Sequence, residues 1–198
     1  ILSSVRFLCA LTYLDDIIVF SSSFEKHLRD LSMVLSLLKA DKVTLKLSKC
    51  RFAAPEVPYI GYVLGKDGLQ VDQSKTSSVQ AAFPPQTKTG IRRFLGMCGV
   101  YRRFISGYAK IASALTRYLK DKVPDHFGLD EATVVAHRQL KESITTAPIL
   151  ALPLTKGTYV LEADASSAQL GVQLLQQQPD DSYRPIWYWS RQCSPVEC

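Results

Sequence analysis

The first hydrophobic positions of the chain form two short apolar runs that are separated by two acidic residues. Residues 7–11 (Phe-Leu-Cys-Ala-Leu) make the first run, and residues 17–20 (Ile-Ile-Val-Phe) make the second. Short runs rich in β-branched and aromatic residues predict strands. Asp15 and Asp16 then occupy a tight hairpin turn between the strands, where aspartate is a favoured residue.

A helix and a third strand are predicted next. Residues 22–25 (Ser-Ser-Phe-Glu) have the pattern of a capping box, which starts a helix. Leucines follow at helical spacing and predict one buried face: Leu28, Leu31, Leu35 and Leu38. The helix should end at residues 41–42. The alternation of apolar and polar side chains over residues 43–47 then predicts a half-buried strand.

A second hairpin is predicted over residues 59–71. Residues 59–64 (Tyr-Ile-Gly-Tyr-Val-Leu) form its first strand, residues 65–68 its turn, and residues 69–71 its return strand. Gly61 lies inside the first strand, which indicates a bulge or a close backbone approach. The Pro84–Pro85 pair predicts a linker.

The next segment predicts a helix from about Thr89, with two faces of different character. Its apolar stripe consists of Ile91, Phe94, Leu95, Cys98 and Tyr101. The other face carries Arg92, Gly96, Gly99 and Arg103. Each interior glycine costs about 1 kcal/mol relative to alanine. Two interpretations fit: another helix packs on the glycines beside solvated arginines, or this face lies against nucleic acid.

Charge favours the nucleic-acid interpretation of that helix. The formal net charge is +6, and residues 88–122 hold nine basic residues against the single acid Asp121. The remaining 15 basic and 17 acidic residues nearly cancel. A basic excess that is confined to one segment indicates a polyanionic partner.

The remainder of the chain predicts two helices and then three strands. Apolar spacing predicts a helix with Ile111, Leu115 and Leu119, and another with Val135, Leu140 and Ile144. The strands are expected at residues 158–163, 171–175 and 184–189. Asp164 follows the first strand. Taken alone, an aspartate there is more often a strand-end cap than a catalyst, because metal-dependent hydrolysis needs several ligands.

Composition sets limits on the class of protein. The 198 residues are 46% hydrophobic, which is enough for one large domain or for two to three small ones. Five cysteines are an odd number, which favours reduced thiols inside a cell. No signal peptide or membrane-spanning run is visible, so no membrane partner is expected. The chain starts at Ile1 rather than at Met, and both ends have the character of a piece of something longer.

The paired aspartates are candidates for metal chemistry. Ionised carboxylates that leave water are costly unless they are paired or metal-bound. Mg²⁺ is usually held by one or two carboxylates together with substrate phosphates. Two such ions about 3.5–4 Å apart stabilise the attacking and leaving oxygens in polymerases and nucleases. The alternative is an ordinary solvated Asp-Asp turn.

An ordered set of motifs resembles one family. Residues 13–16 (Tyr-Leu-Asp-Asp) resemble the Y-x-D-D motif of reverse transcriptases. Further stretches resemble those of the Pol polyprotein of gypsy-type long-terminal-repeat retrotransposons, which are retrovirus-like. They are residues 48–50, 59–62, 93–96, 101–105, 146–150, 163–166 and 188–191, in the family's order along nearly the whole chain.

The resemblance implies an α+β fold in three parts. Residues 1–83 would be the C-terminal part of a reverse transcriptase palm, with antiparallel hairpins and a helix. Residues 84–150 would be a helical thumb or connection. Residues 151–198 would be the N-terminal strands of a ribonuclease H-like domain. The implied function is RNA-directed DNA polymerisation with linked ribonuclease H activity.

Individual roles follow from the same resemblance. Asp15 and Asp16 would be catalytic palm carboxylates that bind Mg²⁺, with Mn²⁺ as an alternative, and Asp164 would be a catalytic, metal-binding carboxylate of the ribonuclease H site. The nucleic-acid contacts would come from the motif tyrosine, the hairpin that grips the primer and the thumb helix. These residues are Tyr13, Tyr59, Ile60, Gly61, Tyr62, Arg92, Gly96, Gly99 and Arg103.

The implied partners are an RNA template, a DNA primer, the RNA–DNA hybrid, deoxynucleoside triphosphates and the remainder of the Pol polyprotein. The implied location is intracellular, in cytoplasmic virus-like particles, with the nucleus as a further compartment. The family's first palm aspartate would lie before Ile1, and its other ribonuclease H carboxylates after Cys198. The rival interpretation is therefore a catalytically dead remnant that only binds nucleic acid.

Overall fold

The computed structural model describes residues 2–194 and residue 197. It divides into two compact units, residues 1–60 and residues 61–198. Each unit has its own cluster of buried side chains and is described separately. Among the described residues, no helix is long and apolar enough to span a bilayer.

The first unit is a hairpin packed on one long helix. Strands β1 (Ala10–Tyr13) and β2 (Asp16–Val19) pair antiparallel, and α1 (Phe24–Ala40) follows. A 3-10 turn, η1 (Leu47–Lys49), and strand β3 (Glu56–Tyr59) complete the unit. The core consists of Leu2, Val5, Cys9, Ala10, Val34 and Leu38.

Several boundaries in this unit differ from the sequence predictions. The first strand begins at Ala10, because Phe7 has φ of 63° and sits in a turn. The predicted capping box does not form. Ser23 is the N-cap of α1, and its Oγ accepts a hydrogen bond from the backbone N of Lys26 at 3.2 Å. The predicted strand over residues 43–47 is wrong, since residues 43–46 pair with no strand, the Val43 N donates to the Leu38 carbonyl at 2.9 Å, and η1 starts at Leu47.

The buried face of α1 also differs from the predicted leucine stripe. Asp30, Val34 and Leu38 face the core, whereas Leu28 and Leu35 are exposed. The Asp30 carboxylate is compensated, because it accepts hydrogen bonds from the Ser21 hydroxyl at 2.6 Å and from the Lys26 ammonium at 2.8 Å. A buried carboxylate with two donors remains stable as an anion.

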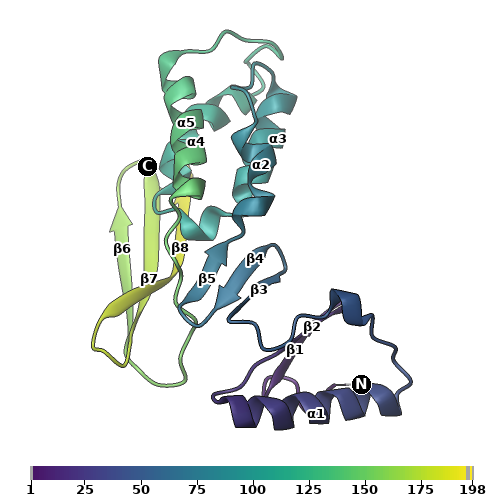
Figure 1. Cartoon of the computed structure of the whole chain (residues 1–198). Coiled ribbons are helices and arrows are strands. Elements are labelled where there is room, and N and C mark those ends of the chain that lie inside the picture. The colour runs from purple at the N-terminus through teal and green to yellow at the C-terminus, as the bar shows by residue number, and fades with distance from the viewer. Residues whose placement is uncertain (1, 195–196, 198) are drawn as a thin grey trace. The chain divides into compact units, whose positions relative to one another are not determined.

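The second unit combines a hairpin, a helical cluster and a three-stranded sheet (Figure 1). Strands β4 (Tyr62–Gly65) and β5 (Gly68–Val71) pair antiparallel around the predicted turn. The helical elements follow in chain order. They are η2 (Gln73–Lys75), α2 (Ser77–Gln80), α3 (Lys88–Gly99), η3 (Arg102–Phe104), α4 (Tyr108–Thr116), η4 (Arg117–Leu119) and α5 (Glu131–Thr145).

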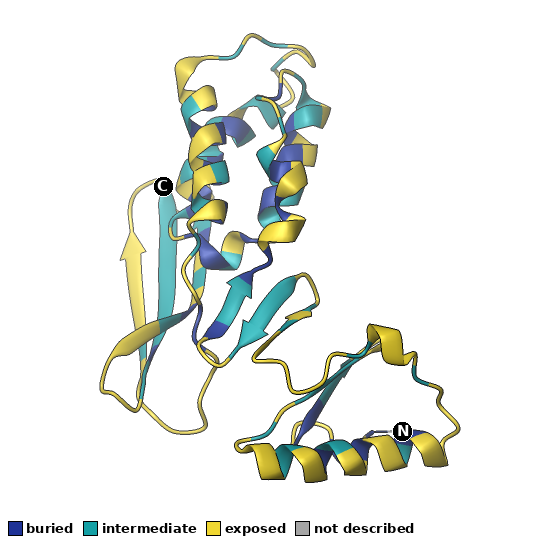
Figure 2. Cartoon of the chain, viewed as in Figure 1, coloured by how far each residue is buried: buried dark blue, intermediate teal, exposed yellow. Residues whose placement is uncertain are grey.

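The sheet of the second unit has three antiparallel strands in the order β6-β7-β8. They are β6 (Tyr159–Ala165), β7 (Gln169–Gln177) and β8 (Tyr183–Gln192), which confirms the three predicted strands with longer bounds. Strand β8 packs against α4. Most residues of β6 are exposed. The buried residues of the helices lie on the sides of α3, α4 and α5 that face one another (Figure 2).

One hydrophobic core runs through the second unit. It contains the predicted apolar stripe of α3, with Ile91, Phe94 and Cys98 at 2% exposure or less. It also contains Leu115 from α4, Leu140 and Ile144 from α5, and Leu150 from the segment that follows. The helices predicted around Leu115 and Leu140 are therefore confirmed, although the first ends at Thr116 and Leu119 lies in η4. The core therefore joins elements on both sides of the boundaries predicted at residues 83/84 and 150/151, which themselves remain predictions.

Candidate metal and nucleic-acid sites

The predicted aspartate pair lies at the tip of the β1–β2 hairpin. Tyr13 pairs with Asp16, so Leu14 and Asp15 are the two loop residues and Asp16 is the first residue of β2. Leu14 has φ of 50°, in the left-handed region. A leucine held there costs about 1–3 kcal/mol, and such strain clusters at functional sites.

Both aspartate side chains are exposed, as is Tyr13 at 53%. The expectation that burial forces these carboxylates to take up a cation is therefore wrong for this structure, since neither leaves water. What the turn does provide is two adjacent, accessible carboxylates on a short, constrained hairpin. This donor set fits a Mg²⁺ ion that completes its shell with phosphate oxygens and water. Among the described residues there is no group of three or more acidic, histidine or cysteine side chains that could hold a metal alone.

Tyr59, at the end of β3, lies within the electrostatic influence of this turn. The pKa of its phenol is raised, first by burial and second by the negative charge of Asp16. The structure therefore brings two of the predicted site residues into one electrostatic environment, although they lie far apart in the sequence.

The predicted single strand over residues 59–64 is wrong. Ile60 and Gly61 have φ of 52° and 80°, and they form a turn between β3 and β4. Two successive residues in the left-handed region are typical of a tight turn, for which glycine is suited. Gly61 is therefore needed for the conformation of this turn. The predicted close backbone approach at Gly61 is absent, because a Cβ there would meet nothing within 4 Å.

The face of α3 that was predicted to meet nucleic acid is open. Arg92 is exposed, and a Cβ at Gly96 would meet nothing within 4 Å. The nearest atom to a Cβ at Gly99 would be the Tyr108 hydroxyl at 4.0 Å. The alternative of helix packing through the glycines therefore fails at Gly96, where the helix presents bare backbone to its surroundings.

Arg103 does not extend this face, because α3 ends at Gly99. It lies in η3, where its guanidinium stacks on Trp187 of β8 with 4.0 Å between Cζ and the ring centroid. Its Nε is buried and has no hydrogen-bond partner among the described residues, and burial lowers the pKa of the guanidinium. Tyr62, another predicted contact residue, donates its hydroxyl hydrogen bond to the Val100 carbonyl at 3.1 Å.

Asp164 lies within β6, opposite Gly171 of β7, and its side chain is exposed. Glu162 is two residues earlier and therefore on the same face of the strand. Glu162 accepts a hydrogen bond from the Gln173 amide. The Asp164 carboxylate is thus accessible, but one carboxylate is an incomplete ligand set for metal-dependent hydrolysis.

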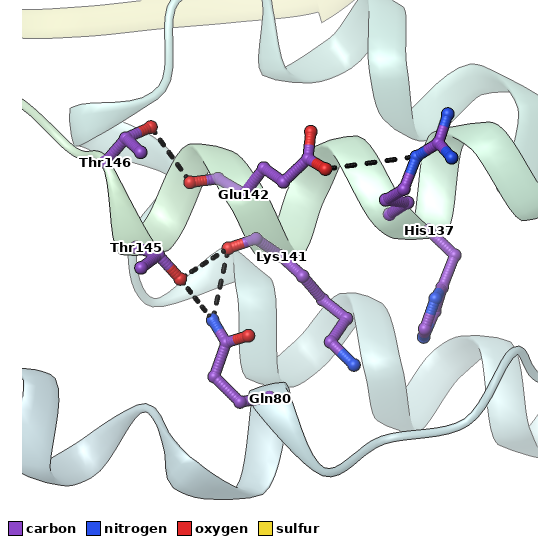
Figure 3. A pocket seen from close by; sticks show the side chains of 7 residues that line it. Gln80, His137, Lys141, Glu142, Thr145 and Thr146 are labelled. Carbon is purple, nitrogen blue, oxygen red and sulfur yellow. Dashed lines mark hydrogen bonds and ion pairs between the residues drawn. The ribbon is translucent and has the colours of Figure 1, made fainter.

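An open pocket of about 320 Å³ lies between α2 and α5 (Figure 3). The Gln80 amide donates hydrogen bonds to the Lys141 carbonyl at 3.2 Å and to the Thr145 hydroxyl at 2.6 Å. His137 also lines this pocket, with its ring 4.4 Å from that of Phe94 and its Nε2 buried without a hydrogen-bond partner among the described residues. These contacts tie α2 and α3 to α5 and bring no predicted site residue into the pocket.

Sequence reasoning missed the contacts that Arg102 and Ser190 make between elements that are distant in the sequence. An Arg102 guanidinium nitrogen donates to the Ser190 carbonyl at 2.8 Å, and the Ser190 hydroxyl accepts from the Ala109 backbone N at 2.9 Å. The residues of each pair lie more than 80 positions apart, so local spacing carries no signal for them. The only signal was the presence of both residues in motifs shared with the family.

Comparison with known proteins agrees with these motifs. Residues 1–64 match the family "Reverse transcriptase (RNA-dependent DNA polymerase)", and residues 129–198 match "RNase H-like domain found in reverse transcriptase". The Pol polyprotein of the Drosophila melanogaster transposon opus is 34% identical over 93% of this chain and 19% of its own length. That of transposon 297 is 37% identical over 84% of this chain and 16% of its own length. This chain thus spans less than a fifth of these relatives.

Solved structures show the same fold. The foamy viral protease–reverse transcriptase in complex with double-stranded DNA aligns with a TM-score of 0.83, at 18% identity, over 95% of this chain and 39% of the other. Its complex with an RNA/DNA hybrid aligns with a TM-score of 0.80, at 18% identity, over 95% of this chain and 25% of the other. The mixed helix-and-strand fold expected from the motifs is therefore confirmed. The two domain matches, with the 34% and 37% identity to transposon Pol polyproteins, show that residues 1–64 belong to the reverse transcriptase family and residues 129–198 to the RNase H-like domain family found in reverse transcriptases.

Proposed function

We propose that this chain contributes to an RNA-directed DNA polymerase with linked ribonuclease H activity, within a retrotransposon Pol polyprotein. The observation that carries the proposal is the strained, exposed hairpin tip with Asp15 and Asp16, in a segment that matches the reverse transcriptase family. The substrates would be an RNA template, a DNA primer, deoxynucleoside triphosphates and the RNA–DNA hybrid.

Both families depend on divalent metal ions, and the residues present fit such chemistry in part. Asp15 and Asp16 would bind Mg²⁺, or Mn²⁺ in its place. A bound metal would stabilise charge on the oxygens that enter and leave the transferred phosphoryl group. Asp164 would serve the separate hydrolytic site as one carboxylate among several.

The remaining predicted residues would hold the nucleic acid, with the exception of Arg103, which stacks on Trp187. Tyr13 is exposed beside the aspartates, and the turn at Ile60 and Gly61 presents accessible backbone. The bare face at Gly96, with Arg92 one turn earlier, suits close approach to a duplex backbone. Counterion release from the phosphates would drive this binding and would make it sensitive to salt. The site of action would be intracellular, in a virus-like particle, with the nucleus as a further compartment.

The hydrolytic half of the proposal is tested by an Asp164→Asn variant of a Pol polyprotein that carries this chain. Cleavage of labelled RNA in an RNA–DNA hybrid should be lost, while RNA-templated primer extension is retained. Glu162→Gln is the matched control, because Glu162 is exposed on the same face of β6. Retained cleavage in Asp164→Asn would contradict the role of Asp164. Binding without extension or cleavage in the unmodified protein would support the rival, a non-catalytic remnant.

A further inference from the structure

Two consecutive arginines of η3 hold strand β8 from its free edge. Arg102 donates to the Ser190 carbonyl at 2.8 Å, and the Arg103 guanidinium lies 4.0 Å from the centre of the Trp187 ring. Strand β8 is at the edge of its sheet, so among the described residues no β-strand pairs with Ser190 on that side. One arginine thus satisfies the strand's backbone, and the next stacks on its side chain.

Ser190 makes the contact reciprocal. Helix α4 follows Gly107, which has φ of 64° and no side chain to cap the helix. The Ser190 hydroxyl from β8 accepts a hydrogen bond from the backbone N of Ala109 in the first turn of α4. The first N–H groups of a helix need such acceptors, so the strand caps the helix in place of its own N-cap residue. Ser190 is 4% exposed, and water cannot readily replace its hydroxyl.

The anchored residue lies in register with the predicted hydrolytic carboxylate. Ser190 pairs with Gly171 of β7, and Gly171 pairs with Asp164 of β6. Two strand spacings, about 10 Å, separate the anchor from Asp164. Ser190, Gly171 and Asp164 thus form one row across the sheet, so a displacement of β8 would reach the strand that carries Asp164.

We propose that Arg102, Arg103 and Ser190 form a docking clamp. The clamp positions the ribonuclease H-like sheet β6–β8 relative to the helical cluster of the second unit, whose helix α3 would lie along the duplex. This inference rests on the proposed function and assigns the three residues a positioning role rather than direct contact with substrate. It gives Arg103 a role other than nucleic-acid binding, in keeping with its stacking on Trp187. The clamp would determine how far along the hybrid the RNA strand is presented for cleavage.

The clamp is tested first on the chain itself, by hydrogen exchange. Ser190→Ala and Arg103→Ala should accelerate exchange of the amides in β6–β8 by about tenfold or more, which corresponds to about 1.4 kcal/mol. Arg103→Lys, which keeps the charge but loses the planar stack, should behave like Arg103→Ala. Ser190→Thr, which keeps the hydroxyl, should restore protection. Arg138→Ala is the matched control, since Arg138 is an exposed arginine on α5. Unchanged exchange in the alanine variants would overturn the clamp.

The positioning role is tested in a Pol polyprotein that carries the same substitutions. The distances between the RNA cuts and the primer 3′ end should spread over several more nucleotides than in the unmodified protein, while primer extension stays within about twofold. Ser190→Thr should restore the narrow distribution. Faster exchange with an unchanged distribution would overturn the positioning role and leave a purely structural contact. Absence of cleavage in the unmodified protein would overturn the proposed function and this positioning role together. The hydrogen-exchange experiment would still show whether the three residues hold the sheet against the helices.

Discussion

Leu150 and Leu69 exchange two main-chain hydrogen bonds, from the Leu69 N to the Leu150 O at 2.7 Å and from the Leu150 N to the Leu69 O at 2.9 Å. The next residue, Ala151, donates its N–H to the Pro185 carbonyl at 2.8 Å. The segment after α5 therefore bridges strand β5 of the hairpin and strand β8 of the sheet. Together with the shared hydrophobic core, this bridge joins the hairpin to the sheet within the second unit.

Gly68 permits this close approach, so Gly68→Ala should strongly destabilise the second unit. Its φ is 134°, and an added Cβ would lie 2.1 Å from the Leu150 carbonyl oxygen. The backbone must separate to relieve such a clash, with loss of buried hydrogen bonds, so we expect a cost of about 3 kcal/mol or more. Urea denaturation measures it. Gly128→Ala is the control, because a Cβ there would meet nothing within 4 Å. Equal stability of the two variants would contradict the bridge.

Gly96→Ala should raise the melting temperature and weaken duplex binding. A Cβ at Gly96 meets open space, so the helix should gain about 1 kcal/mol from the better propensity of alanine. If a duplex backbone lies against this face, the same methyl group obstructs it. A thermal melt and a salt-titrated binding isotherm on one variant separate the effects. A higher melting temperature with unchanged binding would show that this face does not meet nucleic acid.

Arg92 and Arg103 should differ in their effect on binding. Arg92 is exposed on α3, so Arg92→Ala should reduce the slope of log affinity against log salt by about one unit, for one lost phosphate contact. Arg103 is stacked on Trp187, so Arg103→Ala should leave that slope nearly unchanged. Binding of a duplex at several salt concentrations measures both. A smaller slope in Arg103→Ala would contradict this prediction and show that Arg103 contacts nucleic acid directly.

The stability of the second unit should fall in mildly acidic solution because of His137. The pKa of His137 is lowered from 6.5 by burial and by the nearby Lys141 charge, partly offset by a hydrogen bond to the Ala82 carbonyl. The unfolded chain therefore binds the proton more readily than the folded one. Stability is complete above the ordinary pKa and is lost as the pH falls below about 6.5 toward the folded-state pKa.

Replacement of His137 tests this pH dependence. His137→Phe keeps an aromatic ring against Phe94 and should reduce the loss of stability between pH 7.5 and pH 5.5 in urea denaturation. His126→Gln, at an exposed histidine, should retain the pH dependence of the unmodified chain. A pH dependence in His137→Phe as steep as in the unmodified chain would contradict the assignment.

The elements that the sequence predicted correctly are those whose pattern is enforced by burial. Ile91, Phe94 and Cys98 recur at helical spacing because each faces the same core. The prediction failed at residues 43–47, where alternation occurs but no neighbouring strand supplies hydrogen bonds. It also failed at Ile60, because a non-glycine residue in the left-handed region has no sequence signature.

The candidate sites were predictable only as far as local motifs extend. The aspartate pair could be located because its residues are adjacent. The placement of Arg103 could not, because helical spacing was extended beyond Gly99, where α3 ends. Its partner Trp187 is 84 positions away, and such tertiary contacts leave no periodic trace in a single sequence.

The most direct test of the account is RNA-templated primer extension by a Pol polyprotein that carries this chain, in Mg²⁺, with Asp15→Asn and Asp16→Asn as separate variants. Both carboxylates are exposed, so each variant should fold with unchanged stability and yet lose extension. Asp67→Asn is the matched control, since Asp67 is an exposed aspartate in the turn of the β4–β5 hairpin, and it should extend normally. Extension at the unmodified rate in both Asp15→Asn and Asp16→Asn would contradict the account and reduce the pair to an ordinary solvated turn.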